Sequence, residues 1–168
     1  EKIVEFKDAN DAEKAVREIN TGIYAFNNQS LFEGLKHLNN NNAQNEYYLT
    51  DLVEILKKLG KKVVAIPCDD WQEVQGINGN VELAHAAKYM QERINTEWMK
   101  KGVTIYDPNT AYIGPNVTFG TDVIIHPNTY LYGDTTVEDY AEILPGTWLE
   151  DTKVSKAEIV GPFIRRKG

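Results

Sequence analysis

Large apolar residues occupy every sixth position through the last third of the chain. Seven of them follow one another in a single phase: Ile113, Phe119, Ile125, Leu131, Val137, Ile143 and Leu149. Small or β-branched residues lie four positions after the first six, namely Val117, Val123, Thr129, Thr135, Ala141 and Thr147. A six-residue period is typical of triangular coils of three hexads, in which each large residue points inward and stacks on its copy in the next coil. We therefore predict a parallel β-helix, because ordinary short strands would not keep this phase for seven repeats.

The six-residue phase slips once near the end of the chain. Val154 follows Leu149 by five positions, and Val160 then resumes the step of six. The slip predicts a short irregularity at one corner of a coil. Periodicity alone does not determine the hand of the β-helix.

A helical pattern precedes the repeats. One apolar stripe at helical spacing consists of Leu83, Ala87, Met90, Ile94 and Trp98. Asn80 is the expected N-cap, and Gly102 is the expected end after two lysines that complement the negative end of the helix dipole. We predict a linker helix over residues 80–102 that packs along its apolar stripe.

The first 79 residues alternate between two kinds of pattern. Strands are expected at residues 3–6, 21–26 and 63–66, and a short helix or turn at residues 11–18. Two further helices are expected, one capped by Ser30 and one running from a Thr50 cap to Gly60. This alternation indicates an α/β layer arrangement. Because about 80 residues bury a core only marginally, we expect the later part of a larger α/β domain, cut from a longer protein.

Composition excludes several classes of function. Hydrophobic residues make up 42% of the chain, which is enough for a packed core. The net charge of -7 and the absence of a basic stripe argue against a nucleic-acid partner. No apolar run approaches the length that spans a membrane, and the start carries no signal-peptide pattern. The single cysteine leaves no internal disulfide and fits a reducing compartment, so we expect a cytoplasmic protein.

Candidate binding residues lie beside the predicted strands of the front unit. They are Glu5, Asn20, the stretch 46–51 and Asn78. Ligands of open α/β sheets bind outside the carboxyl ends of the strands, so these positions are favoured. Carboxylate and amide side chains there could bind sugar hydroxyls or an acetamido group.

Four separated strings carry a specific resemblance. They are IVEFKDA at residues 3–9, EINTGIY at 18–24, NAQNEYYLTD at 42–51 and EVQGIN at 73–78. Together with the following helix and hexads, they closely resemble the bacterial bifunctional GlmU family. Its members are N-acetylglucosamine-1-phosphate uridyltransferases fused to glucosamine-1-phosphate N-acetyltransferases. The resemblance covers essentially the whole chain and keeps the order of every element.

The resemblance implies a three-part organisation. Residues 1–79 would be the C-terminal part of a Rossmann-like nucleotidyltransferase domain, which transfers uridylyl from UTP to the sugar phosphate. Residues 80–102 would be the linker helix. Residues 103–168 would be the first coils of a left-handed parallel β-helix that forms the acetyltransferase domain and assembles as a homotrimer. The parent protein would make UDP-N-acetylglucosamine for cell-wall peptidoglycan.

The resemblance also assigns roles to residues. Glu5 and Asn20 would hold the N-acetylglucosamine group of UDP-N-acetylglucosamine. Asn78 would contact the same ligand and, through its carboxamide oxygen, help an aspartate to hold Mg²⁺, which prefers hard oxygen ligands. Glu46, Tyr48 and Thr50 would line the sugar side of the pocket, and Asn45 would keep a turn where the family has glycine, since Asn tolerates positive φ.

Several parts of the family pattern have no counterpart in these 168 residues. They are the Gly-rich phosphate loop, the partner aspartate for Mg²⁺, and the later coils with the catalytic histidine and the acetyl-CoA groove. Either Arg166 or Lys167 matches a family arginine that binds the acetyltransferase substrate, and a lysine would lose the bidentate fork. We therefore expect neither activity from this chain alone.

Two alternative interpretations remain open at this point. The chain could come from another sugar-1-phosphate nucleotidyltransferase with a β-helix tail, such as a glucose-1-phosphate adenylyl- or thymidylyltransferase. The 46–51 string and the position of Asn78 argue against this first alternative. The second alternative is a non-catalytic module whose hexad coils trimerise.

Overall fold

The computed structural model describes residues 2–168 and divides the chain into two compact units. The first unit ends at Gly76, and the second runs from Ile77 to Gly168. Each unit is described by itself.

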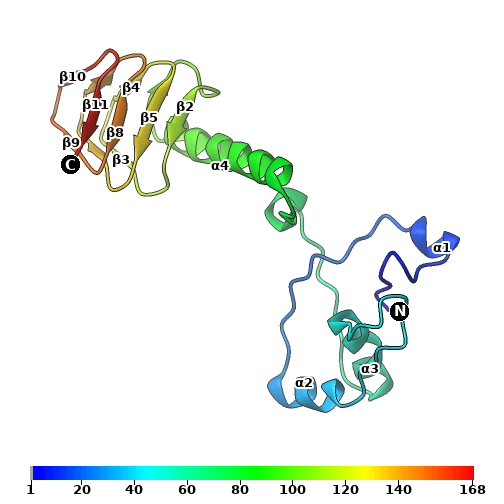
Figure 1. Cartoon of the computed structure of the whole chain (residues 1–168). Helices are drawn as coiled ribbons and strands as arrows, with labels where there is room; N and C mark the ends of the chain where they lie inside the picture. Colours follow the sequence, from blue (N-terminus) through cyan, green and yellow to red (C-terminus); the bar gives the residue numbers. More distant parts are fainter. Residues whose placement is uncertain (1) are drawn as a thin grey trace. The chain divides into compact units, whose positions relative to one another are not determined.

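The second unit contains a parallel β-helix (Figure 1). Its strands are β1 (Thr104–Ile105), β2 (Ala111–Ile113), β3 (Thr118–Phe119), β4 (Ile124–Ile125), β5 (Thr129–Tyr132), β6 (Thr136–Val137), β7 (Glu142–Ile143), β8 (Trp148–Glu150), β9 (Lys153–Val154), β10 (Ile159–Val160) and β11 (Arg165–Lys167). They form three sheets in the orders β1-β4-β7-β10, β2-β5-β8-β11 and β3-β6-β9, and every pair is parallel. This confirms the predicted β-helix, and its coils match the left-handed form that the family resemblance implies.

The hexad residues stack as the six-residue period predicts. Ile113 pairs with Leu131, and Leu131 pairs with Leu149, so one coil takes eighteen residues. These inward rows form one buried apolar cluster. Three threonines are also fully buried, Thr129, Thr135 and Thr147. Each hydroxyl donates to a carbonyl oxygen three residues earlier at 2.6–2.7 Å, which offsets the cost of burying a polar group.

The expected corner irregularity is present. Val137 pairs with Val154, a step of seventeen residues, whereas Phe119 pairs with Val137 at the usual eighteen. The shortened corner contains Asp151, which has a positive φ of 51°. The sequence pattern did not predict a second irregularity, in which Ile105 pairs with Ile125 over twenty residues. The two additional residues of the first coil lie between β1 and β2.

Helix α4 (Asn80–Lys100) precedes the β-helix and packs on its first coil. Ile94 and Trp98 contact the apolar cluster, and the Trp98 ring meets Phe119 edge-on at 5.0 Å between centroids. The prediction of packing along the whole stripe is wrong, because Leu83 and Met90 are 53% and 45% exposed. Both precede the last turns of the helix, which are the turns that contact the first coil through Ile94 and Trp98.

The predicted ends of α4 are partly correct. Gly102 follows the C-cap with φ +97°, as expected for a glycine that ends a helix. At the other end the N-cap is Gly79, and Asn80 is already the first helical residue. The prediction that Asn80 caps the helix is therefore wrong.

The first unit is built from short helices. They are α1 (Asp11–Lys14), α2 (Asn28–Leu35), α3 (Leu52–Lys58) and the 3₁₀ turns η1 (Leu49–Asp51) and η2 (Trp71–Val74). Helices α2 and α3 meet where Gly34 lies against Leu52 and Leu56; a Cβ at position 34 would be 3.0 Å from a Leu52 methyl group. A side chain at position 34 would therefore require Leu52 and Leu56 to shift.

Two predicted helix caps in the first unit are wrong. Asn27 caps α2 by accepting a hydrogen bond from the Ser30 amide, so the helix begins before Ser30. Thr50 lies within η1, and its hydroxyl bonds elsewhere. The predicted end of α3 is correct, since Gly60 follows it with φ +74°.

The three strands predicted in the first unit do not form. No strand is assigned between residues 2 and 76, and residues 3–6, 21–26 and 63–66 run without a ladder partner. Their apolar side chains stay in contact with water: Phe6, Ile23 and Ile66 are 74%, 72% and 86% exposed. A strand exists through hydrogen bonds to a neighbouring strand, and an apolar pattern in one segment does not supply that neighbour.

Candidate functional site

A cluster of polar side chains joins two distant parts of the first unit. The Asp8 amide donates to the Glu5 carbonyl at 2.9 Å, which closes a turn. This bond uses backbone atoms only, so the side chains of Glu5 and Asp8 can make other contacts. The Thr50 hydroxyl donates to Glu5 Oε1 at 3.1 Å across 45 positions of sequence. Because Thr50 is 9% exposed, this bond holds the Glu5 carboxylate in one orientation. The structure therefore brings together two predicted site residues.

Tyr48 belongs to the same cluster. Its hydroxyl accepts a hydrogen bond from Gln44 Nε2 at 2.9 Å and lies 3.3 Å from Asp8 Oδ2. Loss of hydration raises the pKa of Tyr48 above its usual value, and the negative charge of Asp8 acts in the same direction. The phenol therefore stays neutral near neutral pH and can donate its proton to the carboxylate.

The loop that carries Glu46 is closed by its own hydrogen bonds. Asn42 Oδ1 accepts from the amides of Gln44 and Glu46 at 3.1 and 3.2 Å. Asn45 has a φ of 54°, which confirms the expected positive-φ turn. Asp8 Oδ1 accepts from the Ala43 amide at 2.7 Å, so the loop is fastened to the turn at residues 5–8.

The cluster is electrostatically negative. Burial raises the pKa of the Asp51 carboxyl, and the charges of Glu54, Asp8 and Glu5 add to this rise. Carboxylates in such a setting accept hydrogen bonds from hydroxyl and amide donors. The arrangement is suited to a ligand rich in such donors.

Asp8 and Gln44 were missed as site residues by sequence reasoning. Both lie inside strings that carry the family resemblance, but neither lies at the end of a predicted strand. The available signal was spacing, because Asp8 follows Glu5 by three positions and a turn places such residues on one side. Gln44 gives no comparable signal, since its contact with Tyr48 depends on the path of the loop.

Three other predicted residues lie outside this cluster of contacts. Asn20 is exposed, and its Oδ1 accepts from the Gly22 amide at 3.3 Å. The Glu46 side chain is exposed on the loop. Asn78 lies beyond Gly76 in the second unit and is also exposed. Among the residues that the structure describes, no three His, Cys, Asp or Glu side chains gather in a way that could hold a metal ion.

The register of β11 distinguishes Arg166 from Lys167. Arg166 pairs with Leu149 in an inward row, and both of its terminal nitrogens lie 3.1 Å from Glu158 Oε1. Lys167 pairs with Glu150 in an outward row and donates to its carboxylate at 2.8 Å. This contact raises the pKa of Lys167. Both side chains reach the surface, and the Lys167 side chain is the more exposed of the two, at 58% against 38% for Arg166.

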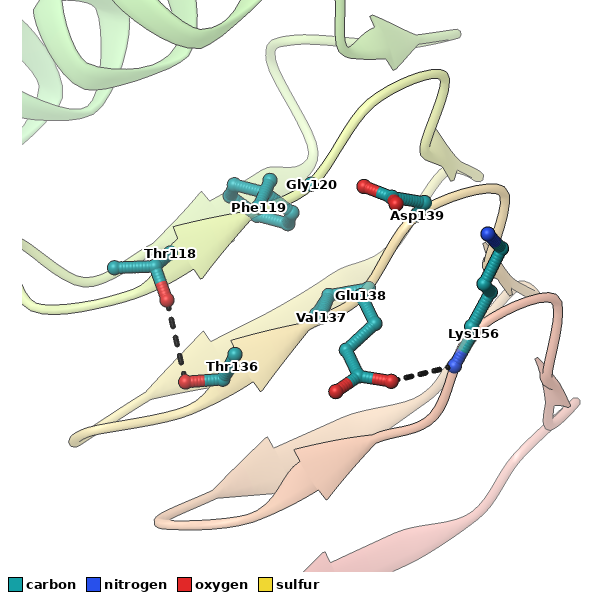
Figure 2. A pocket seen from close by; sticks show the side chains of 8 residues that line it. All are labelled: Thr118, Phe119, Gly120, Thr136, Val137, Glu138, Asp139 and Lys156. Carbon is teal, nitrogen blue, oxygen red and sulfur yellow. Dashed lines mark hydrogen bonds between the residues drawn. The ribbon is translucent and has the colours of Figure 1, made fainter.

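An open groove of about 460 Å³ lies on the sheet β3-β6-β9 (Figure 2). It is lined by Thr118, Phe119, Gly120, Thr136, Val137, Glu138, Asp139 and Lys156. Both of its carboxylates are already engaged. Glu138 binds Lys153 Nζ at 2.6 Å and the Lys156 amide at 2.9 Å, and Asp139 Oδ1 accepts from the Thr121 amide at 2.8 Å. None of the predicted site residues lies in this groove, and it was not foreseen from the sequence.

The fold places the chain in the class of hexapeptide-repeat β-helix proteins. The β-helix follows a packed helix and a small unit in which Glu5, Asp8, Tyr48 and Thr50 form the polar cluster, here called the carboxylate cluster. No protein-family model matches the chain. The chain is 50% identical over 153 residues to the bifunctional protein GlmU of Streptococcus agalactiae. It is 49% identical over 154 residues to that of Latilactobacillus sakei and 45% identical over 160 residues to that of Halalkalibacterium halodurans.

These matches cover 91%, 92% and 95% of the chain but 33%, 33% and 35% of the relatives. The chain therefore spans about a third of the length of the GlmU proteins that it matches. The similarity confirms the resemblance expected from the four strings, and it favours a GlmU-type segment over a different nucleotidyltransferase. Among the described residues, no helix is long and apolar enough to cross a membrane.

Proposed function

We propose that this chain supplies the sugar side of a uridyltransferase site and the first coils of an acetyltransferase β-helix in a GlmU-type enzyme. The observation that carries the proposal is the hydrogen bond between Thr50 and Glu5, which joins two separated family motifs. Tyr48 joins the same cluster through Asp8. The similarity to GlmU proteins over at least 91% of the chain for the three relatives supports it.

In the proposed reaction, the phosphate oxygen of N-acetylglucosamine 1-phosphate attacks the α-phosphorus of UTP, and pyrophosphate leaves. The role of this chain would be to bind the sugar. Glu5, Asn20, Glu46, Tyr48 and Thr50 would offer acceptors and donors to the hydroxyl and acetamido groups. Holding the sugar in one orientation lowers the entropic cost of bringing the two substrates together.

Magnesium would need further ligands besides those of this chain. Asn78 offers one exposed carboxamide oxygen, which suits Mg²⁺ as a neutral hard ligand. A single neutral oxygen does not hold this ion, and no carboxylate cluster of the described residues completes a site. Asn78 therefore fits as one ligand beside an aspartate from elsewhere, and bound Mg²⁺ would neutralise phosphate charge.

The acetyltransferase role is assigned to the second unit. Lys167 is the better candidate for the substrate-binding cation, since Arg166 is held in the inward row by Glu158. We further propose that acetyl-CoA is the co-substrate, that the parent protein assembles as a homotrimer through the β-helix, and that it is located in the cytoplasm. The proposed uridyltransferase part ends at residue 79, the linker helix ends at residue 102, and the acetyltransferase coils follow.

The proposal is tested by a chimera in which residues 1–168 replace the matching third of the Streptococcus agalactiae GlmU. Asn78→Ala should lower uridyltransferase kcat/KM at least about tenfold, because a metal ligand is lost, while acetyl transfer persists. Asn80→Ala, two positions further on, is the matched control and should leave both activities unchanged. Pyrophosphate release and free CoA are the two readouts.

Two results would count against the proposal. An equal loss of both activities in Asn78→Ala would show that the residue has a general structural role. A chimera without uridyltransferase activity, although it folds and transfers acetyl, would remove the sugar-site assignment. The 168-residue chain by itself is the negative control, and we expect no pyrophosphate release from it with UTP, Mg²⁺ and N-acetylglucosamine 1-phosphate.

A further inference from the structure

Asp8 is the residue that connects the two halves of the carboxylate cluster. Its Oδ1 atom accepts from the Ala43 amide at 2.7 Å, and its Oδ2 atom lies 3.3 Å from the Tyr48 hydroxyl. The partners are 35 and 40 positions away in sequence. The contact with Ala43 fastens the 42–46 loop, which carries Glu46. The contact with Tyr48 links Asp8 to a residue that is proposed to line the sugar pocket.

The neighbouring contact of Lys7 is of a different kind. Lys7 Nζ donates to Gln44 Oε1, but both are long side chains and the contact is exposed. Such contacts contribute little, since holding two flexible chains in one geometry costs entropy. The bond from the Ala43 amide to the Asp8 carboxylate joins a backbone donor to a charged acceptor, which makes a shorter and stronger hydrogen bond. Asp8 is therefore the main fastening between turn and loop.

Asp8 also determines which way the hydrogen bonds of Tyr48 run. An ionised carboxylate only accepts, so the phenol must donate its single proton to Asp8. Gln44 Nε2 then donates to the phenol oxygen at 2.9 Å. With its proton donated to Asp8 and its oxygen accepting from Gln44, the Tyr48 hydroxyl is held in one orientation.

We propose that Asp8 is a positioning residue for sugar binding: it fastens the 42–46 loop and fixes the direction of the Tyr48 hydroxyl beside the sugar phosphate. This inference rests on the proposed function of the cluster. Asp8 acts through Tyr48 and the loop, without itself touching the reacting atoms.

The test uses the chimera described above with Asp8→Asn, which keeps the size of the side chain and removes its charge. Asp11→Asn, in the first turn of α1, is the matched control for the change in charge. Asp8→Asn should raise the KM for N-acetylglucosamine 1-phosphate about tenfold, the effect of losing a hydrogen bond to a charged group. The kcat, the KM for UTP and acetyl transfer should stay within about twofold of the control.

Tyr48→Phe separates positioning from a general structural role. It removes the hydroxyl and keeps the ring, so it should also raise the KM for the sugar phosphate. Because Asp8 acts partly through that hydroxyl, the double variant should show less than the product of the two single effects. Independent, multiplicative effects would indicate that Asp8 does not orient Tyr48.

The outcomes distinguish a failure of the positioning role of Asp8 from a failure of the proposed sugar site. Glu5→Gln should raise the KM for the sugar phosphate by itself; if it does not, the sugar-site assignment fails. If Glu5→Gln has its effect but Asp8→Asn stays within twofold of Asp11→Asn, the positioning role is overturned. If Asp8→Asn does not fold, an unchanged KM in Tyr48→Phe overturns it equally.

Discussion

Single residues in the β-helix are selected by the coil that lies next to them. Gly133 follows β5 with φ +61°, and Asp151 occupies the matching corner of the next coil with φ 51°. A positive φ therefore does not by itself require glycine here. What requires it is the neighbour, because a Cβ at position 133 would collide with the Asp151 carboxylate. That carboxylate accepts from the Asp134 amide at 2.9 Å.

Two glycine substitutions in the second unit should therefore lower its stability by different amounts. Gly102 has φ +97° and open space around it, so Gly102→Ala introduces backbone strain alone. We expect it to lower the free energy of unfolding of the second unit by about 1 kcal/mol. Gly133→Ala should cost about 3 kcal/mol, since it also breaks the hydrogen bond between Asp134 and Asp151.

The two variants can be compared by urea denaturation followed by circular dichroism. The difference between them measures the collision with the next coil. Equal costs would mean that the Asp151 carboxylate moves aside without loss, and that the neighbouring coil does not select glycine at position 133.

At the scale of elements, α4 is joined to the β-helix by two carboxamides. Asn95 Nδ2 lies 2.8 and 2.9 Å from the carbonyl oxygens of Pro108 and Ala111. Gln91 Nε2 faces the same two oxygens and that of Asn109 at 3.0–3.2 Å. Four N–H protons thus serve three carbonyl oxygens in the turn that makes the first coil two residues longer.

Asn95→Ala should therefore weaken the attachment of the helix. It leaves the two protons of Gln91 for three carbonyl oxygens and opens a small cavity, since Asn95 is 1% exposed. We expect a loss of about 2 kcal/mol in the free energy of unfolding. The exposed neighbour Thr96 provides the control, because Thr96→Ala should change stability by less than about 0.5 kcal/mol. Thermal melting of both variants measures the two losses. A loss in Asn95→Ala as small as that in Thr96→Ala would mean that the two carboxamides do not hold the helix on the coil.

At the scale of the whole molecule, the two units differ in how much apolar surface they bury. The second unit has a continuous buried cluster from Val103 to Val160. In the first unit Leu52 and Leu56 are the buried large apolar side chains of the described residues, while Ile19 and Ile66 are 80% and 86% exposed. Buried apolar area is the main favourable term in folding, so the second unit should be far more stable.

Hydrogen exchange would show this difference. Backbone amides of β5 and β8 are bonded within the sheet, whereas those of residues 20–26 and 62–66 have no ladder partner. We expect the strand amides to exchange at least about a hundredfold more slowly than those of the extended segments. Mass spectrometry of peptides from both regions in one sample provides an internal control. Comparable protection would mean that the extended segments are paired in solution.

The sequence by itself was sufficient for the β-helix, its corner slip and the existence of α4. The reason is physical: in a solenoid every hexad packs on its own copy, so a local pattern repeats the tertiary contact. Gly60 and Gly102 marked helix ends for a similarly local reason. The family motifs also pointed to Glu5, Tyr48 and Thr50, which the structure brings into one cluster of contacts. Their role in binding a ligand stays a prediction.

Tertiary structure decided what depends on a partner distant in sequence. Strand patterns at residues 3–6, 21–26 and 63–66 did not become strands, because no local pattern supplies a neighbouring edge. Thr50 looked like a helix cap, yet its hydroxyl binds Glu5 across 45 positions. The contacts of Asp8 run across 35 and 40 positions of sequence. Strand register places Arg166 opposite Leu149 and Lys167 opposite Glu150. Long-range contacts of this kind are set by the path of the chain, which one-dimensional spacing does not contain.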